Sequence, residues 1–179
     1  DYPIEHNWPE LVEELIHTVE SKYSEPIFGV GHSLGGILTF LAAIKKPHLF
    51  KAIVLMDALI PSQFRSKMFQ AAKRFGWFDR FTAATRVRKR RTHWPDFANA
   101  LAYFQEKPLF KHFDPECLQD YVRYGTQETA DGIHLRFDRN IESRIFQTIP
   151  HDIPRYRGQL QVPTTLIYSK HHSLVNRFD

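Results

Sequence analysis

The segment GHSLGG places Ser33 between Gly31 and Gly35 in the pattern G-x-S-x-G. A serine in this pattern can act as a nucleophile when it lies on a sharp turn between a strand and a helix, because its hydroxyl then projects from the sheet. The two glycines are expected to relieve the collision between the strand and helix backbones. The amide of Leu34, at the start of the expected helix, could donate to a developing oxyanion. The pattern therefore predicts acyl transfer at Ser33.

The flanking residues predict the elements that would position this serine. Apolar spacing predicts an amphipathic helix over residues 8–22, capped by Asn7 with Glu10 three residues later. Short apolar runs predict strands over 26–31 and 51–56, and an apolar helix over 34–45 separates them. Strands that are apolar throughout are typical of a parallel sheet covered by helices on both faces, so the predicted fold class is α/β.

Residues 61–160 predict a departure from the sheet. Helices are expected near 62–75, 78–90, 95–106 and 114–124, and a third strand over 162–169. We therefore expect a core over 1–60, a helical cap over 61–160 and the core again over 161–179. Sheets usually hold about four to six strands, so three strands predict a fragment that lacks earlier strands and at least one later strand. The cap region holds 17 of the 25 aromatic residues, which favours a substrate with an apolar or acyl portion.

The sequence resembles the α/β-hydrolase superfamily of serine hydrolases, in particular its members with a helical cap. The resemblance is carried by GHSLGG, by KKPHLFKAIVLMDALIP and by QVPTTLIYSKHHSLV. It implies that Ser33 is the nucleophile and that the second oxyanion donor comes from a loop that this chain lacks. It also implies a catalytic histidine after a last strand, and none of the ten histidines occupies that place. This chain alone is therefore expected to be inactive.

The acid of the implied catalytic triad has several candidates. The superfamily usually places it after the strand represented here by 165–169, but His172 stands there instead of a carboxylate. A minority of members use an acid at the end of the preceding strand, which corresponds to Asp57. That residue could equally be a strand-end aspartate that caps the local turn, and both interpretations stay open. Asp179 is a further candidate.

Three other residue types could do chemistry but favour structural interpretations. His32 adjoins the nucleophile and is expected to support the elbow, which is the sharp strand-to-helix turn that carries Ser33. It is not expected to be the base, because a base must reach the hydroxyl from across the site. His171 and His172 are neighbours whose side chains would point to opposite faces, so we expect loop residues and no metal pair. Cys117 is expected to be a small apolar filler in a cap helix.

Composition limits the remaining classes. The chain has 42% hydrophobic and 25% charged residues in 179, which excludes disorder and coiled coil. One cysteine allows no internal disulfide, and no Cys/His zinc spacing is present, so we expect neither a metal nor a cofactor. No apolar stretch approaches the ~20 residues of a membrane span, and no signal-like segment is visible, so a cytoplasmic protein is favoured.

The net charge of +4 is local, because five cations lie within residues 86–91. This run is expected to be a solvated helix end, with nucleic-acid binding as the alternative. The leading hypothesis is a serine hydrolase that cleaves an ester or thioester bond of a small molecule, without nucleic acid as a partner. The alternative is a non-catalytic ligand-binding or scaffold protein on the same fold.

Overall fold

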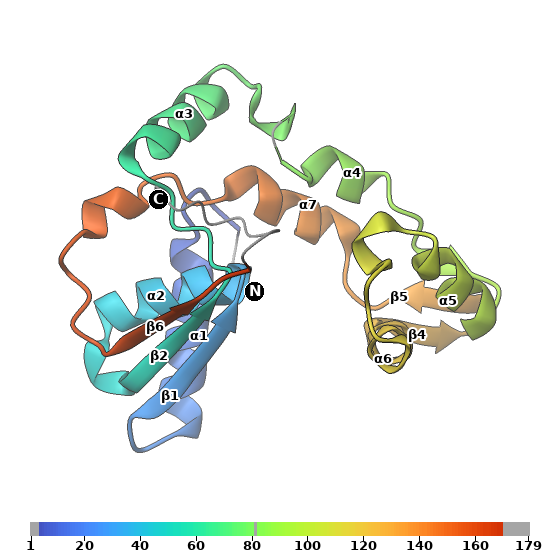
Figure 1. Cartoon of the computed structure of the whole chain (residues 1–179), viewed down its shortest axis with the longest axis horizontal. Helices are drawn as coiled ribbons and strands as arrows, with labels where there is room; N and C mark the ends of the chain where they lie inside the picture. Colours follow the sequence, from blue (N-terminus) through green and yellow to red (C-terminus); the bar gives the residue numbers. More distant parts are fainter. Residues whose placement is uncertain (1–3, 81, 170–179) are drawn as a thin grey trace. The chain divides into compact units, whose positions relative to one another are not determined.

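A computed structural model of the chain describes residues 4–80 and 82–169 (Figure 1). The described residues form two compact units. Unit 1 contains the residues up to 80 and those from 148 onward, and unit 2 contains Thr82–Gln147. Unit 1 holds a parallel sheet and unit 2 a small antiparallel sheet, each of three strands.

Unit 1 is built on strands in the order β1-β2-β6, all parallel, which confirms the α/β class. The strands are β1 (Ile27–His32), β2 (Phe50–Met56) and β6 (Thr164–Ile167). The helices are α1 (Pro9–Lys22), α2 (Leu34–Lys45) and α3 (Gln63–Arg74), with the short 3₁₀ segments η1 (Pro47–Leu49), η2 (Phe78–Arg80) and η4 (Ile153–Tyr156).

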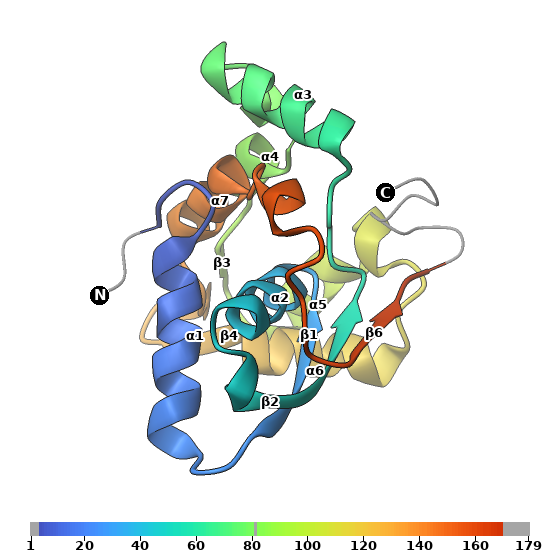
Figure 2. The ribbon, with the colours of Figure 1, turned by 90° about the vertical axis from the view of Figure 1, so that its left-hand side faces the viewer.

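The described residues cover one face of this sheet. Helix α2 packs against β1 and β2, and α1 packs against α2 (Figure 2). Gly29 and Gly31 face α2, whereas Phe28 and Val30 point to the other face and are 70% and 63% exposed. The expectation of cover on both faces is therefore wrong for the described residues. Side chains alternate along a strand, so an apolar run places half of its residues on each face whether or not that face is covered.

The start of α1 differs from the expected cap. Asn7 and Trp8 both have positive φ, at 68° and 57°, and no side chain caps the helix. Asn7 Oδ1 instead accepts a hydrogen bond from the His151 amide at 3.0 Å, and Trp8 Nε1 donates to Thr148 Oγ1 at 2.9 Å. Pro9 at the first helical position suits the start without a cap. The predicted cap is wrong because a tertiary contact uses the Asn7 side chain.

Helix α2 is enclosed on several sides, as its sequence predicts. Its middle residues are buried, including Phe40, Leu41, Ala42 and Ala43. Its C-terminal residue, Lys45, forms an ion pair with Glu13 of α1. Among the described helices, none has both the length and the apolar character that crossing a bilayer requires.

Unit 2 is less helical than predicted. It contains the helices α4 (Ala84–Arg88), α5 (Phe97–Gln105), α6 (Pro115–Gly125) and α7 (Arg139–Thr148, whose last residue belongs to unit 1), and η3 (Pro108–Phe110). Its antiparallel sheet consists of β3 (His93–Trp94), β4 (Thr126–Thr129) and β5 (Gly132–Leu135) in the order β3-β5-β4. The sequence patterns did not predict this sheet or α7. The helix predicted over 78–90 is two short pieces, η2 and α4.

The core of unit 2 is largely aromatic. Trp94 is fully buried and its ring centroid lies 5.3 Å from those of Tyr103 and Phe104. Leu118 and Val122 bring one face of α6 into this cluster. Cys117 lies on the outer face of α6 and is exposed, so its predicted role as an apolar filler is wrong.

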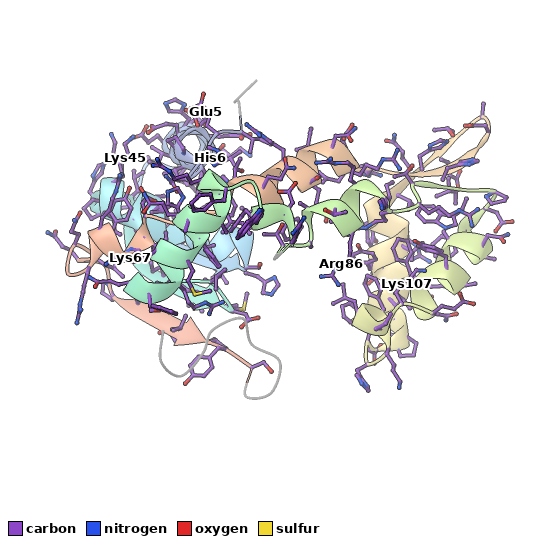
Figure 3. The ribbon with its side chains drawn as sticks, turned by 90° about the horizontal axis from the view of Figure 1, so that it is seen from above. Glu5, His6, Lys45, Lys67, Arg86 and Lys107 are labelled. Atoms are coloured by element: carbon purple, nitrogen blue, oxygen red, sulfur yellow. The ribbon has the colours of Figure 1, made fainter. Side chains whose placement is uncertain are left out.

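The basic run is a solvated helix end, as predicted. Arg86 and Arg88 are exposed in the last turn of α4, and Figure 3 labels Arg86 there. Cations suit this position because the helix dipole is negative at its C-terminus. Arg90 lies just beyond the helix and pairs with Glu142 of α7 at 2.9 Å.

Lys73 ties the end of α3 to the chain that returns from unit 2. Its Nζ donates to the Ile149 carbonyl at 2.5 Å, lies 3.2 Å from His151 Nδ1, and sits 4.9 Å from the Phe78 ring centroid. Burial lowers the pKa of Lys73 from 10.5 to about 8, although the Asp152 charge opposes this shift. The unfolded chain therefore holds the Lys73 proton more tightly than the folded chain does.

Stability is expected to rise with pH through this window. Below pH 8 both states are protonated and the burial cost is complete, whereas between about 8 and 10.5 the folded state alone loses its proton. Allowing for partial exposure, we expect a gain of about 1 kcal/mol in the free energy of unfolding across the window. Urea unfolding at several pH values should show this gain in the native protein and in Lys67→Met, an exposed control on the same helix. The proposed origin fails if Lys73→Met retains the gain.

Candidate active site

Ser33 lies between β1 and α2 with an unusual backbone. Its φ is 50° and its ψ is −113°, a combination that residues other than glycine rarely adopt. Its amide donates to the Met56 carbonyl of β2 at 2.9 Å, which holds the turn against the neighbouring strand. Its side chain makes no capping hydrogen bond with α2 and is half-buried. Such backbone strain, of about 1 to 3 kcal/mol, is typical of functional turns.

The turn is tight on one side only. A Cβ at Gly31 would lie 2.3 Å from the Gly35 carbonyl oxygen, so the strand must carry glycine there. At Gly35 a Cβ would have nothing within 4 Å, so the expectation that both pattern glycines are required is wrong for this one. Gly36 is the second tight position, because its Cβ would lie 2.7 Å from the Ala58 Cβ. The adjacent glycines Gly35 and Gly36 are the signal in the sequence that could have indicated this second tight position.

Alanine substitutions at Gly31 and Gly35 are expected to have opposite effects on stability. Gly31→Ala places a methyl group against backbone and should destabilise unit 1 by about 3 kcal/mol. Gly35→Ala should stabilise it by up to about 1 kcal/mol, because alanine loses less backbone entropy in a helix. Urea unfolding curves of the two variants would check this, and equal effects would contradict the described turn.

The N-terminus of α2 offers unused amides beside Ser33. The first helical hydrogen bond runs from the Ile37 amide to the Ser33 carbonyl at 3.1 Å. The amides of Leu34, Gly35 and Gly36 therefore have no acceptor within the helix. They point out of the positive end of a 12-residue helix dipole. An oxyanion formed at the Ser33 side chain would be stabilised by such amides.

Asp57 occupies the equivalent position at the end of β2. His32 and Met56 are partners in the parallel ladder, so Ser33 and Asp57 follow paired residues and lie at the same edge of the sheet. Asp57 also has positive φ, at 47°, and its amide donates to the Ile167 carbonyl of β6 at 2.7 Å. Its side chain is half-buried. Both sharp turns are thus anchored to the next strand.

The other predicted site residues divide into two groups. His32 is exposed at the end of β1, beside the turn. His171, His172 and Asp179 lie outside the described residues, so the alternative acid positions stay predictions.

A cavity of about 550 Å³ lies in another part of unit 1. It is lined by α1, α2 and η4 and includes His6, Lys45 and Tyr156, but neither Ser33 nor Asp57. Figure 3 labels His6 and Lys45, two of its lining residues. This cavity is therefore separate from the sheet edge that carries Ser33 and Asp57.

Comparisons with known proteins agree with the α/β fold. The family model described as the alpha/beta hydrolase fold matches residues 11–176. Monoglyceride lipase from Rattus norvegicus is 41% identical over 46 residues, which cover 25% of this chain and 15% of the lipase. A monoglyceride lipase homolog from Monkeypox virus is 38% identical over 52 residues, which cover 28% of this chain and 18% of that protein.

Solved structures share the fold at low sequence identity. A thioesterase domain from the curacin biosynthetic pathway superposes with a TM-score of 0.66 at 19% identity, covering 95% of this chain and 59% of that one. E-2-(acetamidomethylene)succinate hydrolase superposes with a TM-score of 0.64 at 15% identity, and the match covers 93% of this chain and 66% of that one. The chain therefore spans less than two thirds of the length of each of these relatives.

Proposed function

Because this chain belongs to the α/β-hydrolase family, we propose that it is part of a serine hydrolase that cleaves an ester or thioester through an acyl-enzyme on Ser33. The observation that carries the proposal is the positive φ of Ser33 between β1 and α2, with its side chain unused as a helix cap. A residue that only started the helix would have no need of this strained backbone.

The proposed reaction proceeds in two steps. Ser33 Oγ attacks the substrate carbonyl carbon as a base removes its proton, and the carbonyl oxygen becomes an oxyanion that accepts a hydrogen bond from the Leu34 amide. The alcohol or thiol then leaves with a proton, and water hydrolyses the acyl-enzyme. The family resemblance implies a histidine as the base, and we assign this role to none of the described histidines. Asp57 is proposed to orient that histidine.

The proposed substrate is a small molecule with an apolar or acyl portion. The names of the similar proteins, monoglyceride lipase and thioesterase, support a carbonyl bond to an oxygen or a sulfur. The aromatic residues of the proposed cap, residues 61–160, support an apolar group.

Covalent labelling of the intact protein tests the nucleophile. A fluorophosphonate probe should add one label per chain, and peptide mass spectrometry should place it on Ser33. Ser33→Ala should remove the label, and Ser62→Ala, a change in the helix cap of α3, should not. Absence of labelling in a folded protein would instead favour a non-catalytic ligand-binding protein on this fold.

A further inference from the structure

Two histidines and an aspartate meet at one end of the antiparallel sheet in unit 2. His93 of β3 and His134 of β5 are direct cross-strand partners, and their ring centroids lie 4.5 Å apart. Asp131 lies in the two-residue turn between β4 and β5, strands that run side by side in Figure 1. One ligand atom from each of the three residues lies within 4.8 Å of the others. We propose that His93, Asp131 and His134 form a binding site for a divalent transition-metal ion of the Zn²⁺ class.

The distances between the donor atoms suit a shared ion. His134 Nε2 lies 3.1 Å from Asp131 Oδ1, and His93 Nε2 lies 4.0 Å from Asp131 Oδ2. Two ligands bound tetrahedrally to Zn²⁺ at about 2.1 Å are separated by about 3.4 Å. These two distances lie on either side of this value. His93 Nε2 also lies 2.9 Å from the Asp131 backbone carbonyl oxygen, so the His93 ring must exchange this hydrogen bond for the ion when the metal binds. Three protein ligands leave a fourth position for water.

The local backbone holds the ligands in this arrangement. Gly132 has a φ of 130°, and a Cβ there would lie 2.5 Å from the Trp94 carbonyl and 3.0 Å from His93 Nε2. Glycine therefore lets the turn approach β3 closely enough for Asp131 to reach both rings. The Thr129 hydroxyl lies 2.6 Å from Asp131 Oδ1 and helps to orient the carboxylate. A partner of this kind around the ligands commonly strengthens metal binding.

The chemistry of the donors selects the class of ion. Imidazole nitrogens with one carboxylate suit Zn²⁺, Ni²⁺ and Cu²⁺, whereas Mg²⁺ and Ca²⁺ require mainly oxygen ligands. The side chains of His93, His134 and Asp131 are 45%, 33% and 72% exposed, so an ion can enter from solvent. The proposed site differs from the sequence-based expectation of no metal. The sequence did not indicate it, because His93 comes close to Asp131 and His134 only through the pairing of β3 with β5.

Calorimetric titration of the metal-free intact chain with Zn²⁺ tests the site. We expect one ion to bind per chain, with no comparable binding of Mg²⁺. Asp131→Asn and His134→Ala should each weaken this binding by at least about 10-fold. His112→Ala removes an exposed histidine of the same unit outside the cluster and should leave it unchanged.

A second measurement guards against loss of folding. Asparagine suits the turn at position 131, so circular dichroism of Asp131→Asn should match that of the native protein. Bound Co²⁺ should give the visible absorption of a four-coordinate site in the native protein but not in His134→Ala. Equal Zn²⁺ affinity in the native protein and in both folded ligand variants would overturn the proposal. None of these readouts depends on hydrolase activity.

Discussion

Replacing Ser33 with alanine is expected to lower kcat of the intact protein by about 10⁶-fold, because the whole acyl-enzyme pathway depends on its hydroxyl. Stability should change little, since the Ser33 side chain makes no capping hydrogen bond with α2. The measurement is steady-state hydrolysis of p-nitrophenyl esters of increasing acyl length, together with urea unfolding of the same samples. The two measurements together distinguish a loss of chemistry from a loss of folding.

A second serine provides the matched control. The Ser62 side chain accepts a hydrogen bond from the Arg65 amide and caps α3. Ser62→Ala should therefore lower the free energy of unfolding by about 1 kcal/mol while kcat stays within a few-fold of the native value. If the two variants lose activity equally, Ser33 is not the nucleophile.

Replacing Asp57 with asparagine is expected to lower kcat by about 10⁴-fold. An asparagine in place of the proposed acid can no longer hold the histidine in the required tautomer or stabilise its cationic form. Asparagine is also one of the residues that best tolerates positive φ, so the 47° backbone of this position should be kept. Hydrolysis rates and circular dichroism of the same preparation would separate the loss of chemistry from the loss of fold.

The competing role of Asp57 predicts a different pattern. If the residue only serves the turn after β2, Asp57→Asn should keep kcat within a few-fold, whereas Asp57→Ala should lose stability because alanine tolerates positive φ poorly. Asp120→Asn, an exposed change on α6, gives the baseline for removing one negative charge. Nearly native turnover in Asp57→Asn would reject its role as the acid.

Elements with a strong local pattern were predictable. Three segments carry enough apolar residues to predict an element from the sequence alone, although Phe28 and Val30 of the first are exposed: Ile27–His32, Leu34–Lys45 and Phe50–Met56. Their order in the chain then predicts a parallel sheet with the serine turn at its carboxyl edge. The G-x-S-x-G pattern added the position of Ser33 within that turn.

Short elements and side-chain partners were not predictable in this way. Strands β4 and β5 have four residues each, too few for a period to stand out, although Asp131 followed by Gly132 is a hairpin signal. Asn7 has the composition of a helix cap, yet its side chain binds the His151 amide. Contacts between residues so far apart in the chain produce no periodic pattern in the sequence from which they could be predicted.

The sequence by itself determined the fold class, because that depends on the order of apolar strands and helices along the chain, and the place of the candidate nucleophile, because that depends on residues close to Ser33. Only the tertiary structure decided which glycines the turn requires, since the space at Gly36 is limited by Ala58, in the segment that follows β2. In the same way, it alone brought His93 to Asp131 and His134, because the register between β3 and β5 joins residues about 40 positions apart.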